Sequence, residues 1–337
     1  MKVVVTGCAG LIGSHLAHRL QAEGHNVLGV DDFSGGTRDN VVGLTNFVNL
    51  DVRKCNKLTK LFKSFSPNVV HHLSAHPHEG LSQFCPEKIT SSVYNASLSV
   101  FKASINCGSL PRIIYYSSMA RYGNGGLKLP FTEDMPRAPE DIYAIAKCSA
   151  ERALEILSSI HKFDYNIVVP HNVYGERVSL HDPYRNVLAI WINSILRGKP
   201  VIIFGDGGQR RAPSYVEDIL DPIIKLGFNE KINKEIVNIG SFNHYTIKDL
   251  AQMVIDEFKL KLEPMFVEER PCEVKNAYCS ISKSSKLLGF KDKTTIKEGI
   301  HRLVEWAKLV GPQKPIYLEE FEIKNYAPEV WINKILK

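Results

Sequence analysis

The fold of this chain is decided near its beginning, by the stretch Val3-Val4-Val5-Thr6-Gly7-Cys8-Ala9-Gly10-Leu11-Ile12-Gly13-Ser14-His15. Its three β-branched residues predict a buried strand, and the apolar spacing that follows predicts an amphipathic helix. The glycines between them are spaced G-x-x-G-x-x-G. Gly7 permits a sharp exit from the strand, Gly10 lets a pyrophosphate approach the backbone, and Gly13 lets the helix lie close to the sheet. The helix start offers free N–H groups to phosphates, so the stretch predicts a dinucleotide site.

Acidic residues follow the next two apolar runs. The run at residues 26–30 ends in Asp31 and Asp32. A carboxylate at this place accepts hydrogen bonds from the adenosine ribose and repels a 2′-phosphate, so we expect NAD rather than NADP. Asp31 is the main candidate, and Asp32 is either a second ligand or a solvated loop acid. The run at 47–50 ends in Asp51-Val52, which we expect beside the adenine.

The composition excludes several classes of protein. The 337 residues are 44% hydrophobic and carry a net charge of +6, values typical of a globular protein with a full core. Basic residues are scattered, so we expect no nucleic-acid partner. The seven cysteines include no Cys-x-x-Cys pair, which favours free thiols in a reducing compartment over a zinc site. His76-Pro77-His78-Glu79 lacks a further ligand at suitable spacing, so we interpret it as an ordinary loop and predict no metal.

Targeting and membrane signals are absent from the pattern. No apolar run approaches the length needed to span a membrane, so we expect no membrane partner. Met1 and Lys2 lead directly into the first strand, and we therefore expect no secretory signal peptide. These features predict a soluble cytoplasmic protein.

Short apolar strands alternate with helical segments along the first half of the chain. Strands are predicted at residues 68–73, 112–116 and 166–169, and helices at about 54–65, 86–107 and 142–161. The alternation predicts an α/β fold, a Rossmann-type doubly wound parallel sheet with helices on both faces. The neighbours His71 and His72 point to opposite faces of their strand, so we interpret them as packing residues. Small residues in Leu73-Ser74-Ala75 let the chain pass under a cofactor.

The pattern becomes less regular after about residue 175. We expect a NAD-binding domain at residues 1–175, to which later segments return, and a smaller substrate-binding lobe at 176–310. The C-terminal extension at 311–337 alternates aromatic and charged residues. It is either packed across a neighbouring subunit or a loosely held tail.

A second motif, Tyr143-Ala144-Ile145-Ala146-Lys147, carries chemistry. Residues four apart share one face of a helix. A lysine beside a phenol stabilises the phenolate and lowers its pKa, so Tyr143 becomes a base near neutral pH. Ser118 ends an intervening strand and is placed to relay a proton to Tyr143; the alternative role for its hydroxyl is a helix cap.

Together these motifs resemble the extended short-chain dehydrogenase/reductases, in the group of nucleotide-sugar epimerases and dehydratases. The resemblance runs to about residue 308 and includes Asp31, Tyr143 and Lys147. It further implies a homodimer that pairs helices around 87–106 and 142–160 with their symmetry mates. The downstream motifs that carry it are Tyr122-Gly123, His171-Asn172-Val173-Tyr174-Gly175, Phe204-Gly205-Asp206-Gly207-Gly208-Gln209-Arg210-Arg211, Tyr215-Val216-Glu217-Asp218, Asn238-Ile239-Gly240 and Arg270-Pro271-Cys272-Glu273.

The resemblance implies a site in which Ser118, Tyr143 and Lys147 are catalytic and Lys147 also holds the nicotinamide ribose. It implies that Arg211 and Arg270 clamp a sugar diphosphate, a role that suits the two-pronged contact of arginine with phosphate. The cofactor-binding candidates besides Tyr143 and Lys147 are Gly7, Gly10, Leu11, Ile12, Gly13, Asp31, Asp32, Asp51, Val52, Leu73, Ser74, Ala75, Asn95 and Pro170. The other substrate-binding candidates are Asn172, Asn186, Phe204 and Ala277.

The two residues after Ser118 bear on the reaction. In the family, 4,6-dehydratases carry an Asp-Glu pair there, and UDP-glucuronate decarboxylases tend to carry Glu at the second place. This chain has Met119 and Ala120, and neither side chain transfers a proton. We therefore expect a NAD-dependent 4-epimerase of a nucleotide sugar. The alternatives are a 4,6-dehydratase, a decarboxylase or a reductase of the same family, and a cofactor-binding protein without turnover.

The resemblance also implies how the substrate lies. Asn172 would contact the diphosphate, and Phe204 would pack on the nucleotide base. Ala277 stands where related UDP-hexose epimerases with a narrow pocket have a bulky tyrosine, so we expect room for a 2-acetamido group. The expected substrate is a UDP-hexose or a UDP-N-acetylhexosamine. A shift of one residue would place Tyr278 there and reverse the conclusion.

Overall fold

A seven-stranded sheet forms the centre of the first lobe in the computed structural model, which describes residues 1–123 and 128–337. The strand order is β11-β6-β5-β4-β1-β2-β3, and every neighbouring pair is parallel. The predicted parallel α/β sheet is therefore confirmed. Its strands are β1 Lys2–Thr6, β2 Asn26–Asp31, β3 Asn46–Asn49, β4 Val69–His72, β5 Arg112–Tyr116, β6 Tyr165–Pro170 and β11 Ile236–Ile239.

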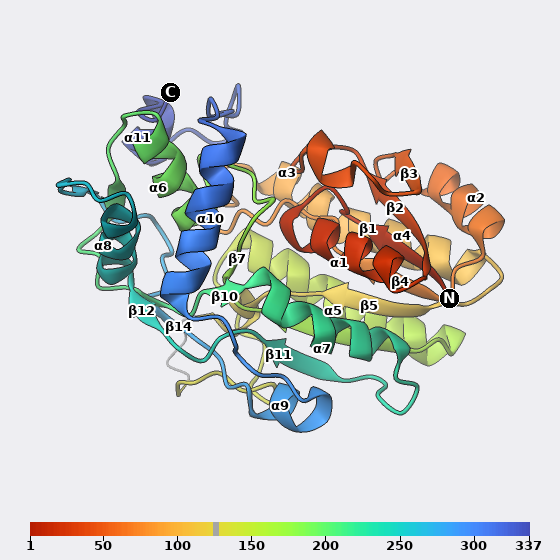
Figure 1. Ribbon diagram of the computed structural model, residues 1–337. Helices are drawn as coiled ribbons and strands as arrows, with labels where there is room; N and C mark the ends of the chain where they lie inside the picture. The colour runs from red at the N-terminus through yellow and green to blue at the C-terminus, as the bar shows by residue number, and fades with distance from the viewer. Residues whose placement is uncertain (124–127) are drawn as a thin grey trace.

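Helices cover both faces of this sheet (Figure 1). One face carries α1 (Leu11–Ala22) and α7 (Val216–Phe228), whose apolar residues share a core with β1. The other face carries α2 (Cys55–Phe65), α4 (Ala96–Asn106) and α5 (Ile142–His161). The two histidines of β4 point to opposite faces of the sheet. His71 lies against α7, and His72 forms a hydrogen bond with Ser97 of α4.

The predicted helix at 86–107 has three parts. It begins as α3 (Pro86–Thr90), continues through a π-helical turn at Ser91–Asn95, and ends as α4. A π turn holds one extra residue, so it changes which side chains face the cavity and which face solvent.

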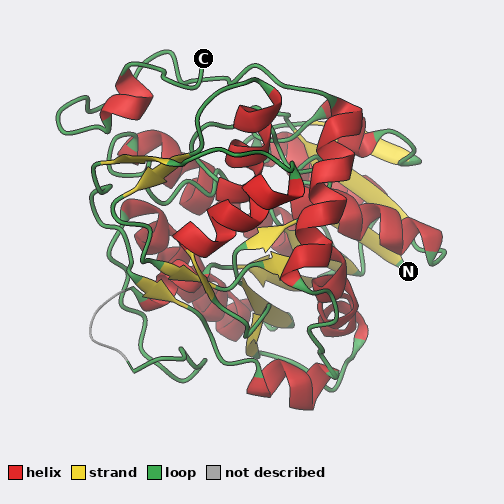
Figure 2. Cartoon of the chain, turned by 60° about the vertical axis from the view of Figure 1, so that its left-hand side comes forward, coloured by secondary structure: helices red, strands yellow, loops and turns green. Residues whose placement is uncertain are grey.

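The second lobe is built around α6 (Val187–Leu196), α8 (Ile247–Glu257) and α10 (Ile296–Val310), which share one apolar core. Figures 1 and 2 show this lobe beside the sheet. α9 (Ser282–Leu288) packs near β11. The short strands here are β7 Val173–Tyr174, β8 Ile202–Phe204, β9 Arg210–Arg211, β10 Ser214–Tyr215, β12 Tyr245–Thr246, β13 Met265–Val267 and β14 Asn276–Ala277.

Residues 311–337 pack on their own chain, an arrangement that neither expected alternative described. The carboxylate of Glu322 accepts hydrogen bonds from the backbone N–H groups of Glu87 and Lys88, at 2.8 and 2.9 Å, in the first turn of α3. A short helix, α11 (Glu329–Ile332), brings Trp331 into the core, where it is 2% exposed. The extension is thus a folded part of the subunit.

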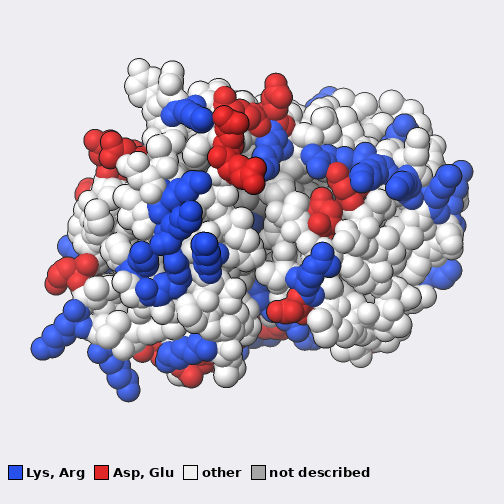
Figure 3. Space-filling view, turned by 90° about the horizontal axis from the view of Figure 1, so that it is seen from above, with Lys and Arg blue, Asp and Glu red and all other residues white. Residues whose placement is uncertain are grey.

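Each of the seven cysteines is a free thiol. No helix among residues 1–123 and 128–337 is both long and apolar enough to span a membrane. On the face seen from above, basic side chains form separate groups with acidic side chains between them (Figure 3).

Candidate active site

A cavity of about 470 Å³ opens at the carboxyl ends of the sheet strands. Asp31, Ser118 and Pro170 line it from the ends of β2, β5 and β6. Phe204 and Arg211 line it from the second lobe. Ligands of open α/β sheets bind at this edge, outside the carboxyl ends of the strands.

Every site residue predicted from the sequence lines this cavity except Asn95. Asn95 is exposed and stands at the end of the π turn, whereas Ser92 and Ala96 of the same helical stretch line the cavity. The sequence interpretation assumed a regular helix, and the π turn changes its phase. Asn95 therefore stands apart from the other candidates, which line the cavity.

Steric contacts explain two of the glycines. Gly7 has φ +74°, and a Cβ there would lie 2.8 Å from backbone atoms of Leu73 and Ser74. A Cβ on Gly13 would lie 2.1 Å from the carbonyl oxygen of Gly7. Among the described residues, no side chain caps the first turn of α1, so the backbone N–H groups of this turn are available to a ligand. Leu11 and Ile12 of the same turn line the cavity. This cradle of backbone N–H groups fits a pyrophosphate.

Asp31 fixes the glycine turn as well as facing the cavity. Its Oδ2 accepts a hydrogen bond from the N–H of Ala9 at 2.9 Å, and its Oδ1 accepts one from Phe33 at 2.8 Å. Burial raises its pKa, and these two backbone donors oppose the shift. Each carboxylate oxygen has a second lone pair, so the group retains capacity to bind ribose hydroxyls. The glycine cradle and Asp31 together fit NAD.

The three catalytic candidates meet at the ends of β5 and α5. Lys147 donates to the backbone carbonyl of Tyr116 at 2.6 Å, and its Nζ lies 5.8 Å from the centroid of the Tyr143 ring. Ser118 caps the following helical turn, because its Oγ accepts a hydrogen bond from the N–H of Ala120 at 3.2 Å. It also lines the cavity, as the expected proton relay requires. The sequence thus predicted a set of groups that the fold brings together.

Buried charges hold α5 against β5 behind this set. Glu151, one turn after Lys147, has a fully buried carboxylate that accepts from the hydroxyl of Ser117. Arg121 and Arg137 pair with the same carboxylate, with Nε–Oε distances of 3.2 and 2.6 Å. Because the carboxylate has several partners, it fixes the helix that carries Tyr143 and Lys147.

The electrostatics of the set differ from the sequence expectation. Burial lowers the pKa of Lys147 to about 7, although Glu151 opposes the shift. Burial, and then the charge of Glu79, raises the pKa of Tyr143 above its ordinary value, while Ser118 and Arg185 act in the opposite direction. The predicted lowering of the Tyr143 pKa by Lys147 is therefore wrong for the protein alone. A bound nicotinamide ring would add positive charge beside the phenol and favour phenolate.

The carboxyl groups in the cavity that were not predicted as site residues include those of Glu79 and Asp141. Glu79 accepts a hydrogen bond from Ser118 Oγ at 3.3 Å. Asp141 caps α5 by accepting from the N–H of Ala144 at 2.7 Å, and burial together with the charge of Glu79 raises its pKa to about 7. Glu79 had been interpreted as part of an ordinary loop, and nothing in its local pattern connects it with a serine 39 residues later.

The neighbouring histidines of that loop have protein partners. His78 Nε2 lies 2.9 Å from Asp182 Oδ2, and His76 Nε2 lies 3.1 Å from the Ser34 hydroxyl. In the described ranges, the one group of three residues with ligand atoms close enough for a metal is Glu257, His301 and Glu305. That group lies on α8 and α10, outside the cavity lining.

One carboxylate holds the two arginines that were predicted to clamp a diphosphate. Glu273 pairs with Arg211 at 2.9 Å and with Arg270 at 2.6 Å. The Arg270 guanidinium also lies over the ring of Phe204, 4.9 Å from its centroid. Two converging guanidinium groups at the second-lobe side of the cavity fit an anionic diphosphate.

The C-terminal extension adds residues that the sequence did not connect with the site. Val330, Trp331 and Leu336 line the cavity, and the Trp331 ring lies 6.1 Å from that of Phe204. Asn186 stands at the N-cap position of α6 in a left-handed conformation, and its side chain donates to the carbonyl of Val173 at 3.2 Å.

Ala277 forms part of the cavity wall. Ala277 is 7% exposed and lines the cavity from β14, next to Arg211 of β9. Tyr278 instead stacks on His244, with ring centroids 4.1 Å apart. Of these two neighbours, Ala277 is therefore the one in the cavity wall. Asn172 lines the same cavity and donates to Met119 Sδ at 3.4 Å.

Comparison with known proteins agrees with this geometry. A sequence profile described as the NAD dependent epimerase/dehydratase family matches residues 3–240. The chain belongs to this family. It is thus an enzyme of a NAD-dependent family, and the resemblance seen in the sequence is confirmed.

Family members similar to this chain differ in their reactions. A putative UDP-glucose 4-epimerase of Methanocaldococcus jannaschii is 32% identical over 91% of this chain and 98% of its own. A UDP-N-acetyl-alpha-D-glucosaminuronate decarboxylase of Bacillus cytotoxicus is 28% identical over 90% and 97%. The crystal structure of UDP-glucose 4-epimerase with UDP-glucose from Thermotoga maritima has a TM-score of 0.86 at 29% identity, covering 92% and 99%.

Proposed function

We propose that this protein interconverts the C4 epimers of a UDP-hexose through a transient 4-keto sugar, with NAD that stays bound. The observation that carries the proposal is the meeting of Ser118, Tyr143 and Lys147 in one cavity, between the glycine cradle and the arginine pair. A glycine turn alone would support any dinucleotide-binding protein. The arginine pair adds a place for the diphosphate of a nucleotide sugar.

Each residue has a defined task in this reaction. Tyr143 takes the proton of the 4-hydroxyl, directly or through Ser118, and later returns it. Arg211 and Arg270 keep the diphosphate in place while the flat 4-keto sugar turns over. Lys147 holds the nicotinamide ribose from its position beside the Tyr116 carbonyl. NAD supplies a hydride acceptor at C4 and, once reduced, a donor to the opposite face, so no net oxidation occurs.

The wall around Ala277 supports a substrate range that includes UDP-N-acetylhexosamines. Because Tyr278 stacks on His244 rather than lining the cavity, the methyl group of Ala277 borders the space there. A pocket rejects a larger group by steric overlap, and an alanine provides little of it. We propose that UDP-N-acetylglucosamine and UDP-N-acetylgalactosamine are interconverted at least as well as the unsubstituted pair.

Glu79 and Asp141 favour a second candidate, 4,6-dehydration. Loss of the 6-hydroxyl as water requires a base at C5 and an acid for the leaving oxygen. Met119 and Ala120 cannot supply them, but Glu79 and Asp141 bring two carboxyl groups into the same cavity. Asp141 is the weaker of the two, because it already caps α5.

One experiment separates the candidates. The purified NAD-loaded protein is incubated with UDP-glucose and, separately, with UDP-N-acetylglucosamine, and the products are resolved by proton NMR. The proposal expects an anomeric signal of the C4 epimer in both reactions. A new methyl doublet at C6 would instead establish dehydration. Absence of any epimer with either sugar would reject the 4-epimerase.

A further inference from the structure

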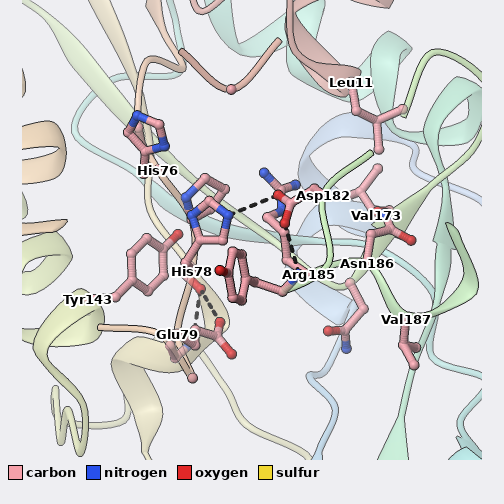
Figure 4. Close-up of a pocket in the computed structure, with 18 of the residues that line it drawn as sticks. Leu11, His76, His78, Glu79, Tyr143, Val173, Asp182, Arg185, Asn186 and Val187 are labelled. Atoms are coloured by element: carbon pink, nitrogen blue, oxygen red, sulfur yellow. Dashed lines mark hydrogen bonds and ion pairs between the residues drawn. The ribbon is translucent and has the colours of Figure 1, made fainter. Parts of the chain in front are cut away.

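Glu79 occupies a fixed position in the cavity, in the loop that follows β4. Its backbone carbonyl accepts hydrogen bonds from the N–H and the hydroxyl of Ser82, at 3.1 and 2.7 Å. Its carboxylate accepts from the Oγ of Ser118 at 3.3 Å. Figure 4 shows Glu79 on the same side of the cavity as Tyr143, across from Leu11, Val173 and Val187.

The charge of Glu79 interacts with groups in both parts of the proposed substrate site. Burial raises its pKa, while Arg211 and Arg270 lower it from the diphosphate side. On the other side, its charge raises the pKa of Tyr143. Glu79 lines the same cavity as Tyr143 and the two arginines and contacts Ser118, so a sugar whose diphosphate lies on the arginines and whose C4 lies at Tyr143 shares the cavity with this carboxylate.

We propose that Glu79 is a specificity-determining residue, whose carboxylate selects uncharged hexose rings over hexuronate rings. The inference rests on the proposed function, because it uses the same position of the sugar. A carboxylate accepts hydrogen bonds from sugar hydroxyls, since it has four lone-pair sites and no donor. A carboxylate on the sugar would be repelled, because like charges placed together in a partly dry site are unfavourable.

Arg185 is the cation that bears most directly on this argument, since it also lines the cavity. It lies beside Asp182, which also pairs with His78 at 2.9 Å (Figure 4). Burial would raise the pKa of Asp182, but the charges of His78 and Arg185 hold it below the ordinary value. The carboxylate of Asp182 therefore offsets part of the positive charge of Arg185.

The test measures binding rather than turnover. Isothermal titration at about pH 8, chosen well above the ordinary pKa of a carboxyl group because burial raises the pKa of Glu79, gives the affinities of UDP-glucose and UDP-glucuronate for the NAD-loaded protein. The ratio of the two affinities is the decisive quantity, because loss of a negative charge near Arg211 and Arg270 strengthens the binding of both diphosphates. Glu79→Gln removes the charge and keeps an acceptor for Ser118. Glu305→Gln, on an exposed side chain of α10, is the matched control.

We expect the wild type and Glu305→Gln to bind UDP-glucose at least about tenfold more tightly than UDP-glucuronate. In Glu79→Gln this preference should fall about tenfold, and Glu79→Asp should retain most of it. An unchanged ratio in Glu79→Gln, or a wild type that prefers the uronate, overturns the proposal. The NMR assay of epimerisation is separate, so a protein that fails that assay but shows the expected ratios rejects the reaction and not the role of Glu79.

Discussion

Lys147 is anchored to the backbone carbonyl of Tyr116, 2.6 Å away, at the end of β5. Its ammonium lies 5.8 Å from the centroid of the Tyr143 ring in the preceding turn of α5. The lysine therefore acts on the phenol through space. Burial disfavours the charged form of Lys147, so a bound nicotinamide ring would supply the positive charge that favours phenolate.

Tyr143→Phe should reduce turnover at least about a hundredfold, the usual size of acid–base catalysis. The ring is 4% exposed, and phenylalanine keeps its packing. NAD affinity should change little, because the glycine turn and Asp31 are untouched. Steady-state kinetics and titration with NAD measure the two effects. Near-normal epimerisation by this variant would contradict the role assigned to Tyr143.

Lys147 should make the stability of the NAD-free protein depend on pH. Burial lowers its pKa from 10.5 to about 7, so between these values the unfolded chain binds a proton that the folded protein has lost. Its contribution to the free energy of unfolding therefore rises with pH, by up to about 1.4 kcal/mol per unit. Urea denaturation of wild type and Lys147→Met from about pH 7 to 9 measures it. The free energy of unfolding of the wild type should increase relative to that of Lys147→Met as the pH rises.

The control for this measurement is Lys308→Met, at an exposed side chain that pairs with Glu305. The difference between its free energy of unfolding and that of the wild type should stay nearly constant over the same pH range. A constant difference for Lys147→Met would show that Lys147 remains charged when the protein folds.

Ala277→Tyr should lower kcat/KM for UDP-N-acetylglucosamine at least about tenfold relative to UDP-glucose, because the added ring fills the space beside the sugar. Tyr278→Ala is the control, since Tyr278 stacks on His244 and its loss should leave the preference between the two sugars unchanged. If instead Tyr278→Ala changes the preference and Ala277→Tyr does not, the assignment of the wall residue is wrong.

The protein should be a dimer in solution. α5 exposes Ile145, Ile156 and Ile160, which are 47%, 44% and 63% exposed, and their spacing places them on one side of the helix. Light scattering at micromolar concentration should give twice the subunit mass, and Ile156→Glu should lower it to one subunit. Leu309→Glu, at an exposed site on α10, should leave the dimer intact. A wild-type monomer would refute the prediction.

The sequence was most informative where chemistry and local structure coincide. The glycine turn and the Tyr143–Lys147 pair each lie within a few consecutive residues, so spacing alone places their groups on one side of an element. Asn95 was misplaced because a π turn has no clear sequence pattern. Glu79 could not be assigned, since its contact with Ser118 depends on how the loop after β4 lies over the end of β5. The pKa of Tyr143 depends on burial, which spacing does not report.

The C-terminal extension has a consequence for how the active site is made. Trp331 and Leu336 line the cavity, and Arg197 of the second lobe donates a hydrogen bond to the carbonyl of Leu336. Because this segment follows the catalytic candidates and the arginine pair in the sequence, the wall beside Phe204 is the last part of the cavity lining to be synthesised.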